Sequence, residues 1–136
     1  MGLPGSGKTT LAKELAKQIN AVHWNADAVR ENINKDLGFS MADRIEQSRR
    51  MGWLCNTVTQ AGYNVIADFV CPTEETRSAF GPCFLIYMDT IKEGRFADTN
   101  KLFQPPTKYD SKILDYNARD YARMYKEQWE NFSVGQ

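Results

Sequence analysis

The segment that most constrains the fold of this chain lies at its start, where residues 2–9 read GLPGSGKT. These residues fit the pattern G-x-x-x-x-G-K-[ST], in which a glycine-rich loop wraps its backbone N–H groups around phosphate oxygens and leads into a helix. The glycines matter because a Cβ would hinder that close approach. Leu11, Leu15 and Ile19 then recur at helical spacing, so the segment predicts a phosphate-binding loop followed by an amphipathic helix over residues 8–19.

This loop predicts binding of a nucleoside triphosphate such as ATP. Lys8 has the length and charge to reach the β- and γ-phosphates, and the hydroxyl of Thr9 suits Mg²⁺. The helix that follows would point the positive end of its dipole at the same phosphates. The simpler alternative is a glycine-rich turn that only caps a helix. We expect nucleotide contacts along the loop and the start of the helix, from Gly2, Pro4, Gly5, Ser6, Gly7, Lys8, Thr9 and Thr10.

Helix and strand patterns alternate along the rest of the chain. Strands are expected over residues 21–25, 63–70 and 83–89, and helices over residues 27–33 and 42–61, from Thr73 as N-cap to Phe80, and from about residue 117. Residues 98–109 hold two adjacent prolines and several polar residues, which indicates a loop. The alternation predicts one α/β domain over residues 1–136, with a parallel sheet flanked by helices.

Composition excludes several classes of protein. The chain carries 17 basic and 17 acidic residues, and this balance argues against sequence-blind nucleic-acid binding, which needs a positive field. No apolar run approaches the ~20 residues that cross a bilayer, and no signal peptide pattern is present, so no membrane association is expected. One histidine and three cysteines without a CxxC pair argue against a zinc site, and reduced thiols indicate the cytoplasm.

The segment after the second expected element suits an acceptor for the phosphoryl group. Open parallel sheets bind ligands at the carboxyl ends of their strands, and Asp27 and Arg30 follow such an end, three residues apart on one helix face. A carboxylate there would orient a hydroxyl or a hydrated Mg²⁺, and an arginine would hold an anion through two hydrogen bonds. The alternative is an N-cap aspartate and a surface arginine.

Longer motifs follow, and together they resemble one known family. Residues 34–40 read NKDLGFS and residues 43–50 read DRIEQSRR. With residues 25–30 they resemble the adenylylsulfate kinase family, whose members carry L-D-G-D-x-x-R, N-x-D-L-G-F-S and D-R-x-E-N-x-R-R at this spacing. Residues 62–72 are similar to the family's next strand, which ends F-I-S-P. The resemblance runs from Gly2 to about Arg77 and weakens beyond it.

The resemblance implies a P-loop kinase fold and an Mg²⁺-dependent transfer of the γ-phosphoryl group of ATP to the 3′-hydroxyl of adenylyl sulfate. The product would be 3′-phosphoadenylyl sulfate, an intermediate of sulfate assimilation. Lys8 and Asp27 would be the catalytic residues, with Asp27 orienting the 3′-hydroxyl. Substrate contacts are implied for Asp27, Arg30, Phe39, Arg44, Gln47, Val70, Cys71, Lys101 and Phe103, and metal contacts for Thr9, Asp27 and Asp68. Phe39 would stack on adenine, or alternatively fill the core.

Several positions depart from the family pattern. Asn25 replaces the first aspartate of D-G-D, Gln47 replaces an asparagine, and Cys71 replaces the serine of F-I-S-P. Asp68, near the end of its strand, would partly replace the charge lost at Asn25, or else face solvent. In the family's lid motif D-x-K-G-L-Y, the lysine is shifted to Lys101 and the tyrosine is Phe103, which would form a second wall against Phe39.

These departures keep other functions open. The chain would alternatively be a P-loop kinase of another small-molecule alcohol, or a truncated or non-catalytic nucleotide-binding protein. A homodimer is left open as the assembly. His23 is expected to be packed or exposed at a sheet edge rather than catalytic, because no acid–base partner lies near it in the sequence.

A P-loop normally follows an apolar strand, and only Met1 precedes Gly2 here, so the fold apparently lacks its first strand. The expected strands at 63–70 and 83–89 would then each miss a partner, unless they close up and pair directly. We therefore expect the chain as given to be poorly stable or inactive, and an added upstream strand to correct this, because unpaired buried backbone groups cost about 1–3 kcal/mol each.

Overall fold

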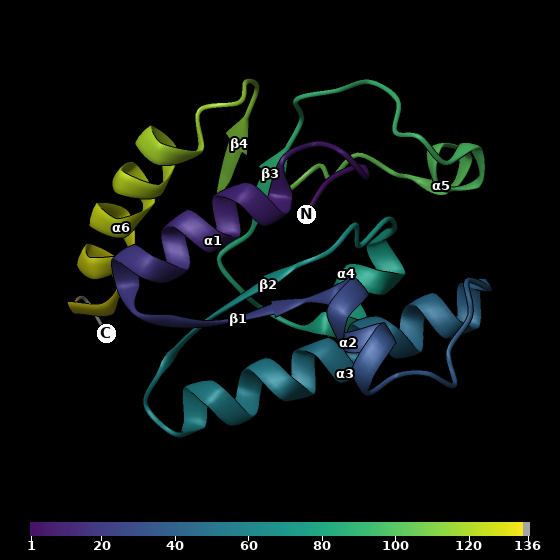
Figure 1. Cartoon of the computed structure of the whole chain (residues 1–136), viewed down its shortest axis with the longest axis horizontal. Helices are drawn as coiled ribbons and strands as arrows, with labels where there is room; N and C mark the ends of the chain where they lie inside the picture. Colours follow the sequence, from purple (N-terminus) through teal and green to yellow (C-terminus); the bar gives the residue numbers. More distant parts are fainter. Residues whose placement is uncertain (135–136) are drawn as a thin grey trace.

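The alternation of helices and strands that the sequence predicts is present in the computed structural model, which describes residues 1–134 (Figure 1). The elements in chain order are α1 (Lys8–Ile19), β1 (Ala21–Asn25), α2 (Ala26–Asn32), α3 (Met41–Gln60), β2 (Asn64–Asp68), α4 (Glu74–Phe80), β3 (Ile86–Met88), α5 (Ala97–Leu102), β4 (Ser111–Ile113) and α6 (Ala118–Val134). The expected α/β fold with parallel strands is therefore confirmed.

The strands form two parallel pairs instead of one continuous sheet. β1 pairs with β2, with Ala21 opposite Asn64 and Asn25 opposite Asp68, and β3 pairs with β4. The expected strands at 63–70 and 83–89 have not closed up on each other, because β2 and β3 are not hydrogen-bonded neighbours. Met1 lies between them and bonds through its backbone to β3.

The helices form two layers, one against each face of the strands. α1 packs against α6 on one side, and α3 packs against α4 on the other (Figure 1). The first layer holds a core of apolar side chains from helices and strands: Leu11, Leu15, Met88, Ile113, Ala122 and Tyr125. A second core gathers Ala26, Val29 and Met51, with Trp24 and Phe80 packed against it. These two cores hold the carboxyl ends of β1 and β2 next to the loop before α1.

Local side chains fix where several helices begin. Asn25 accepts a hydrogen bond from the N–H of Ala28 at the start of α2, and Ser40 accepts one from Asp43 at the start of α3. Thr73 caps α4 as expected, with Thr76 completing a reciprocal capping box. Asn25 therefore serves as a helix cap even though it stands where the related motif has an aspartate.

Two short elements differ from the expectation. Residues 98–109 were expected to form a loop, but α5 occupies Ala97–Leu102, and β4 at Ser111–Ile113 was not expected at all. α5 has only six residues and β4 only three, which is too short for a periodic pattern to show. β4 depends on its pairing with β3, which lies far from it in the sequence. No helix among residues 1–134 is long and apolar enough to span a membrane.

The contact between α3 and α4 gives the first testable prediction. A Cβ on Gly52 would overlap the carbonyl oxygen of Phe80. We expect Gly52→Ala to lower the free energy of unfolding by about 1–3 kcal/mol, since overpacking forces the two helices apart. Helix propensity alone would favour alanine by about 1 kcal/mol. Urea denaturation separates the two effects, because overpacking predicts a loss of stability and propensity predicts a gain. Asn56→Ala, at an exposed position one turn further along the same helix, is the control, and a Gly52→Ala chain as stable as the original would contradict the packing.

Candidate functional site

The loop before α1 has the backbone conformation that a phosphate-binding loop needs. Gly5 and Gly7 have φ angles of +87° and +95°, in the left-handed region that residues with a Cβ rarely adopt. The N–H of Ser6 donates to the carbonyl of Leu3 at 3.1 Å and closes a turn. A Cβ on Gly2 would lie 2.6 Å from the carbonyl oxygen of Met88. Glycine is therefore required at these positions by the backbone as well as by any bound phosphate.

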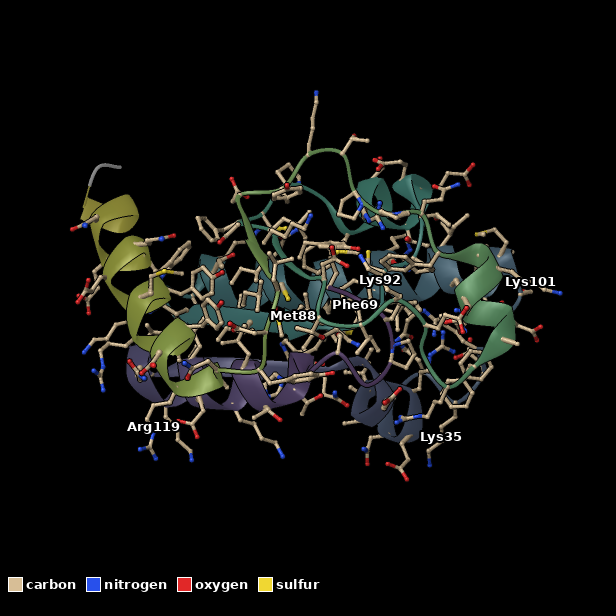
Figure 2. All side chains as sticks on the ribbon, turned by 90° about the horizontal axis from the view of Figure 1, so that it is seen from above. Lys35, Phe69, Met88, Lys92, Lys101 and Arg119 are labelled. Atoms are coloured by element: carbon tan, nitrogen blue, oxygen red, sulfur yellow. The ribbon has the colours of Figure 1, made fainter. Side chains whose placement is uncertain are left out.

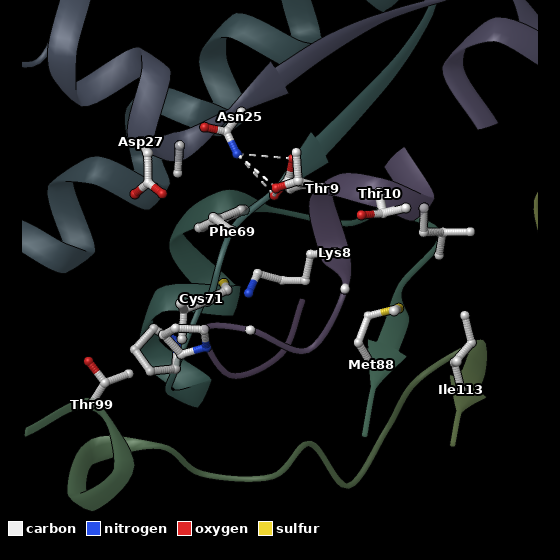
Figure 3. A pocket seen from close by; sticks show the side chains of 18 of the residues that line it. Lys8, Thr9, Thr10, Asn25, Asp27, Phe69, Cys71, Met88, Thr99 and Ile113 are labelled. Atoms are coloured by element: carbon white, nitrogen blue, oxygen red, sulfur yellow. Dashed lines mark hydrogen bonds between the residues drawn. The ribbon is translucent and has the colours of Figure 1, made fainter. Parts of the chain in front are cut away.

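Lys8 is the cation of this loop and lies in the middle of the cavity (Figure 3). Its Nζ donates to the carbonyl oxygen of Leu3 at 2.9 Å. Burial lowers the pKa of Lys8 to about 8, although the carboxylates of Asp68 and Asp27 act in the opposite direction. An ammonium group that is partly desolvated and donates to a backbone carbonyl is well placed to bind an anion.

Asp68, at the end of β2, is the centre of a hydrogen-bond network that joins three elements. Its carboxylate accepts a bond from the hydroxyl of Thr9 on α1 at 3.1 Å and from Nδ2 of Asn25 on β1 at 3.2 Å. Nε2 of His23 lies 2.5 Å from Oδ2 of Asp68. Burial raises the pKa of Asp68, but the bonds from His23, Asn25 and Thr9 outweigh it, so the pKa is lowered. The alternative of a solvent-facing acid is wrong, because Asp68 is only 4% exposed.

For His23, only part of the expectation from the sequence is confirmed. It is packed, as expected, but it does have an acidic partner, which lies 45 residues away in the chain. The register of β1 and β2 places Asn25 opposite Asp68, and His23 shares the face of Asn25 because side chains alternate along a strand. Had the pairing of β1 and β2 been assumed from the sequence, this register would have predicted the contact between His23 and Asp68.

The oxygen atoms at this point suit a hard cation. The hydroxyl of Thr9 and the carboxylate of Asp68 meet at the start of α1, and Asp27 lines the same cavity. Within residues 1–134, no cluster of three or more His, Cys, Asp or Glu side chains could hold a metal by itself. Mg²⁺ is usually bound by one or two carboxylates together with phosphate oxygens. The residues present therefore fit an Mg²⁺ ion that arrives with a nucleotide.

A cavity of about 580 Å³ connects the phosphate loop with α2, the start of α3 and the segment around α5. This volume falls within the usual range of ligand pockets, about 300–1,000 Å³. Most of the residues singled out from the sequence line it, namely Pro4, Gly5, Gly7, Lys8, Thr9, Thr10, Asp27, Arg30, Phe39, Arg44, Gln47, Asp68, Val70 and Cys71. The structure thus brings the nucleotide side and the acceptor side of the expected site into one space.

Phe39 lines one end of the cavity, beside two arginines. The guanidinium carbons of Arg30 and Arg44 lie 4.4 Å and 5.5 Å from the centre of its ring. Arg30 also donates to the carbonyl of Gly38 at 2.7 Å, and Arg44 donates to that of Phe39 at 2.9 Å. The ring is 69% exposed, so the alternative that Phe39 fills the core is wrong. An exposed ring beside two cations suits a flat, anionic ligand.

Three further residues expected from the sequence line the cavity: Gln47, Val70 and Cys71. Gln47 is 3% exposed, accepts a bond from Asn34 at 2.7 Å and donates to the carbonyl of Ala26 at 3.3 Å, so both ends of its amide are held by the protein. Cys71 is buried, has a φ of +49°, and burial raises the pKa of its thiol. Contact of these residues with a substrate stays a prediction.

The lid residues are placed differently from the expectation. Lys101 extends away from the molecule on the outer side of α5 (Figure 2). Phe103 contacts the ring of Tyr87 at 6.3 Å between centroids and the guanidinium of Arg77, and it does not face Phe39. Phe96, Arg95 and Thr99 line the cavity instead. Thr99 lies in the segment that was expected to be a loop, and Arg95 and Phe96 precede that segment and the lid motif, so no pattern singled them out.

Comparison with known proteins gives a consistent result. The sequence profile of the adenylylsulphate kinase family matches residues 1–92. An adenylyl-sulfate kinase of Synechococcus sp. (strain JA-3-3Ab) is 40% identical over 101 residues, which cover 68% of this chain and 57% of that protein. One from Citrobacter koseri is 33% identical over 131 residues, covering 93% and 58%. The chain spans about half the length of the curated relatives that it matches.

A solved structure is similar over nearly the whole chain. The structure of the Mycobacterium tuberculosis APS kinase CysC in complex with AMPPNP and APS has a TM-score of 0.84 to this one, with 24% sequence identity. The match covers 96% of this chain and 94% of that one. At this level of identity, the likeness supports the fold.

The network around Asp68 gives the second prediction. We expect His23→Leu to lower the free energy of unfolding by about 1–3 kcal/mol, because a buried carboxylate loses a hydrogen-bonding partner. His23→Gln, which keeps a donor, should recover part of this loss in the same urea denaturation experiment. The lowered pKa of Asp68 means that the folded state favours its carboxylate form. The stabilisation that this carboxylate gives is therefore present above about pH 4 and is lost as the pH falls through the folded-state pKa. A His23→Leu effect that stays constant as the pH falls through the folded-state pKa of Asp68 would show that His23 acts through packing alone.

Proposed function

We propose, because the chain belongs to the adenylylsulfate kinase family, that it binds ATP and adenylyl sulfate and transfers the γ-phosphoryl group to the 3′-hydroxyl of the acceptor. The product is 3′-phosphoadenylyl sulfate. One observation carries the proposal: a single cavity has a phosphate-binding loop at one end and an exposed aromatic ring beside two arginines at the other.

The nucleotide end supports the donor half of this reaction. Phosphoryl transfer depends mainly on positioning and on neutralising charge. The backbone of the loop, the start of α1 and the ammonium group of Lys8 all direct positive charge to one place. Thr9 and Asp68 would hold Mg²⁺ beside the phosphates, and the ion would neutralise part of their charge when bound.

The other end supports the acceptor half. Phe39 would stack on the adenine of adenylyl sulfate, and Arg30 and Arg44 would pair with its phosphate–sulfate group. Asp27, at the first turn of α2, lies between the two ends and lines the cavity. It would accept a hydrogen bond from the 3′-hydroxyl and take its proton as the new bond forms.

A kinase of another small-molecule alcohol is the second candidate. Lys101 and Phe103 lie outside the cavity. The side-chain oxygen of Asn25 caps α2. The acceptor side therefore differs from the related motifs at several positions. A nucleotide-binding protein without useful catalysis is the third candidate.

One experiment separates the three candidates. ATP turnover is measured with and without adenylyl sulfate, with chromatography of the products, and a panel of nucleosides, sugars and shikimate-like acids is run in parallel. Formation of 3′-phosphoadenylyl sulfate supports the proposal. Turnover with another alcohol and not with adenylyl sulfate favours the second candidate, and binding of ATP without any turnover favours the third.

The cytoplasm as the location and a homodimer as the assembly are part of the proposal. Cys55, Cys71 and Cys83 are free cysteines, as is usual in a reducing compartment. Exposed apolar side chains such as Trp53 and Leu114 would be covered in an assembly.

The pKa of Lys8 gives the third prediction. Lys8 is a cation below its pKa of about 8 and neutral above it, so we expect affinity for ATP to fall as the pH rises, by about tenfold at pH 9 if only the cation binds phosphate. Arginine keeps its charge over this range, so Lys8→Arg should bind with little change between about pH 7 and about pH 9. Calorimetric titration measures both chains, and an equal decline in both would show that Lys8 is not the titrating group.

The exposed ring of Phe39 gives the fourth prediction. We expect Phe39→Ala to weaken binding of adenylyl sulfate by about 1–3 kcal/mol, the scale of base stacking on an aromatic ring. Phe39→Tyr should bind nearly normally because the ring face remains. Neither change should lower the melting temperature much, since the ring is 69% exposed.

Two results would contradict this assignment. If Phe39→Ala weakens ATP and adenylyl sulfate equally, the ring does not belong to the acceptor end. Phe96→Ala is the matched control, since Phe96 is also exposed and lines the same cavity. A loss confined to Phe96→Ala would move the stacking role to α5.

A further inference from the structure

A series of hydrogen bonds leads from the surface of α3 to the wall of the cavity. Nη1 of Arg50 donates to Oδ1 of Asn34 at 3.2 Å, and Nδ2 of Asn34 donates to Oε1 of Gln47 at 2.7 Å. Nε2 of Gln47 then donates to the carbonyl oxygen of Ala26 at 3.3 Å. Asn34 and Gln47 are 2% and 3% exposed. Gln47 lines the cavity, and Asn34 does not.

The two ends of this series fix the direction of every bond in it. A guanidinium group has donors and no acceptor, and a backbone carbonyl has an acceptor and no donor. Asn34 must therefore offer its oxygen to Arg50 and its NH₂ group to Gln47. Gln47 in turn must offer its oxygen to Asn34 and its NH₂ group to Ala26. A reversed amide at either residue would place two donors or two acceptors against each other inside the protein, which is costly.

Arg50 and Asn34 are also held by groups that lie outside the cavity. Arg50 donates to the two carboxylate oxygens of Asp36 at 2.8 Å and 2.9 Å, and its Nε donates to Glu46 at 2.8 Å. The backbone N–H of Asn34 donates to the carbonyl of Val29 at 2.9 Å. The direction of the series is therefore set before any ligand arrives.

This direction determines what Gln47 can offer to a ligand. Its oxygen is used by Asn34, and Ala26 uses one of the two N–H bonds of Nε2. The second N–H bond is left for the cavity, and it can only donate. Arg44, one turn earlier on α3, lines the same cavity and also can only donate. Together the two side chains suit an acceptor such as an anionic oxygen.

We propose that Asn34 and Arg50 are positioning residues, which fix Gln47 as a hydrogen-bond donor toward an acceptor atom of the substrate, such as an oxygen of its phosphate–sulfate group. The identity of this substrate rests on the proposed function. Asn34 then controls affinity for the acceptor substrate although its own side chain does not line the cavity.

Calorimetric titration of two substitutions at Asn34 tests the direction of the series. Asn34→Asp keeps the shape of the side chain and still accepts from Arg50, but it cannot donate, so Gln47 reverses and turns its oxygen to the cavity. Asn34→Ala leaves both orientations open to Gln47. We expect affinity for adenylyl sulfate to fall by about tenfold or more in Asn34→Asp and by less in Asn34→Ala, with affinity for ATP changed by less than about twofold. A role in packing alone predicts the reverse order, because alanine leaves a cavity and aspartate does not.

Two further variants control for charge and for folding. Asn32→Asp adds the same charge at an exposed position of α2 and should bind adenylyl sulfate normally. Gln47→Glu removes the donor itself at constant length, so it tests the same bond if Asn34→Asp fails to fold, and it should also weaken adenylyl sulfate by about tenfold or more. An equal loss in Asn32→Asp and Asn34→Asp, or normal binding by Gln47→Glu, would overturn the proposal.

Failure of the proposed function would give a different result. If the unchanged protein binds no adenylyl sulfate, the substrate is wrong, and the direction of the series is then read by NMR from the side-chain amide of Gln47 without a ligand. The nitrogen and proton signals of this amide should move in Asn34→Asp, where it gains a carboxylate partner, and stay in Asn32→Asp. Signals that stay in both variants would show that Asn34 does not direct Gln47.

Discussion

The rest of the site depends on the buried carboxylate of Asp68. It lies at the end of β2 and is bonded to His23 and Asn25 of β1 and to Thr9 of α1. A buried carboxylate without partners is costly, so the fold is held in the arrangement that brings these three elements together. The same bonds direct the hydroxyl of Thr9 and the start of α1 toward the cavity. One charged group thus couples strand pairing to the position of the phosphate loop.

The loop also connects the two halves of the structure. On one side, Thr9 ties it to β1 and β2 through Asp68. On the other side, Met1 bonds to β3, and Tyr116, which follows β4, donates to the carbonyl of Gly5 at 3.0 Å. Because β2 and β3 are not paired with each other, these contacts supply much of the linkage between the strand pairs.

The end of the cavity around Phe39 is stabilised differently from the loop. Arg30 and Arg44 are each held by a backbone carbonyl, at Gly38 and Phe39, within the turn that leads into α3. Their charges are thus fixed beside the exposed ring before any ligand arrives, which reduces the entropy lost on binding. Backbone conformation shapes the loop end of the cavity, whereas side chains held by hydrogen bonds shape the end around Phe39.

Features that depend on neighbours within about one helical turn could be predicted from the amino-acid sequence alone. The glycine-rich loop, the helices that follow it and the cap at Thr73 belong to this class, because the residues that create them also satisfy their hydrogen bonds. The family motifs also placed Arg30, Phe39 and Arg44 at one end of the site, and the structure brings them together. Contacts between residues far apart in the chain became evident only in the tertiary structure. His23 meets Asp68 through strand register, β4 exists by pairing with β3, and Phe96 rather than Phe103 reaches the cavity. None of these contacts leaves a local pattern, because the energy that selects them comes from burial and pairing between segments that lie far apart in the chain.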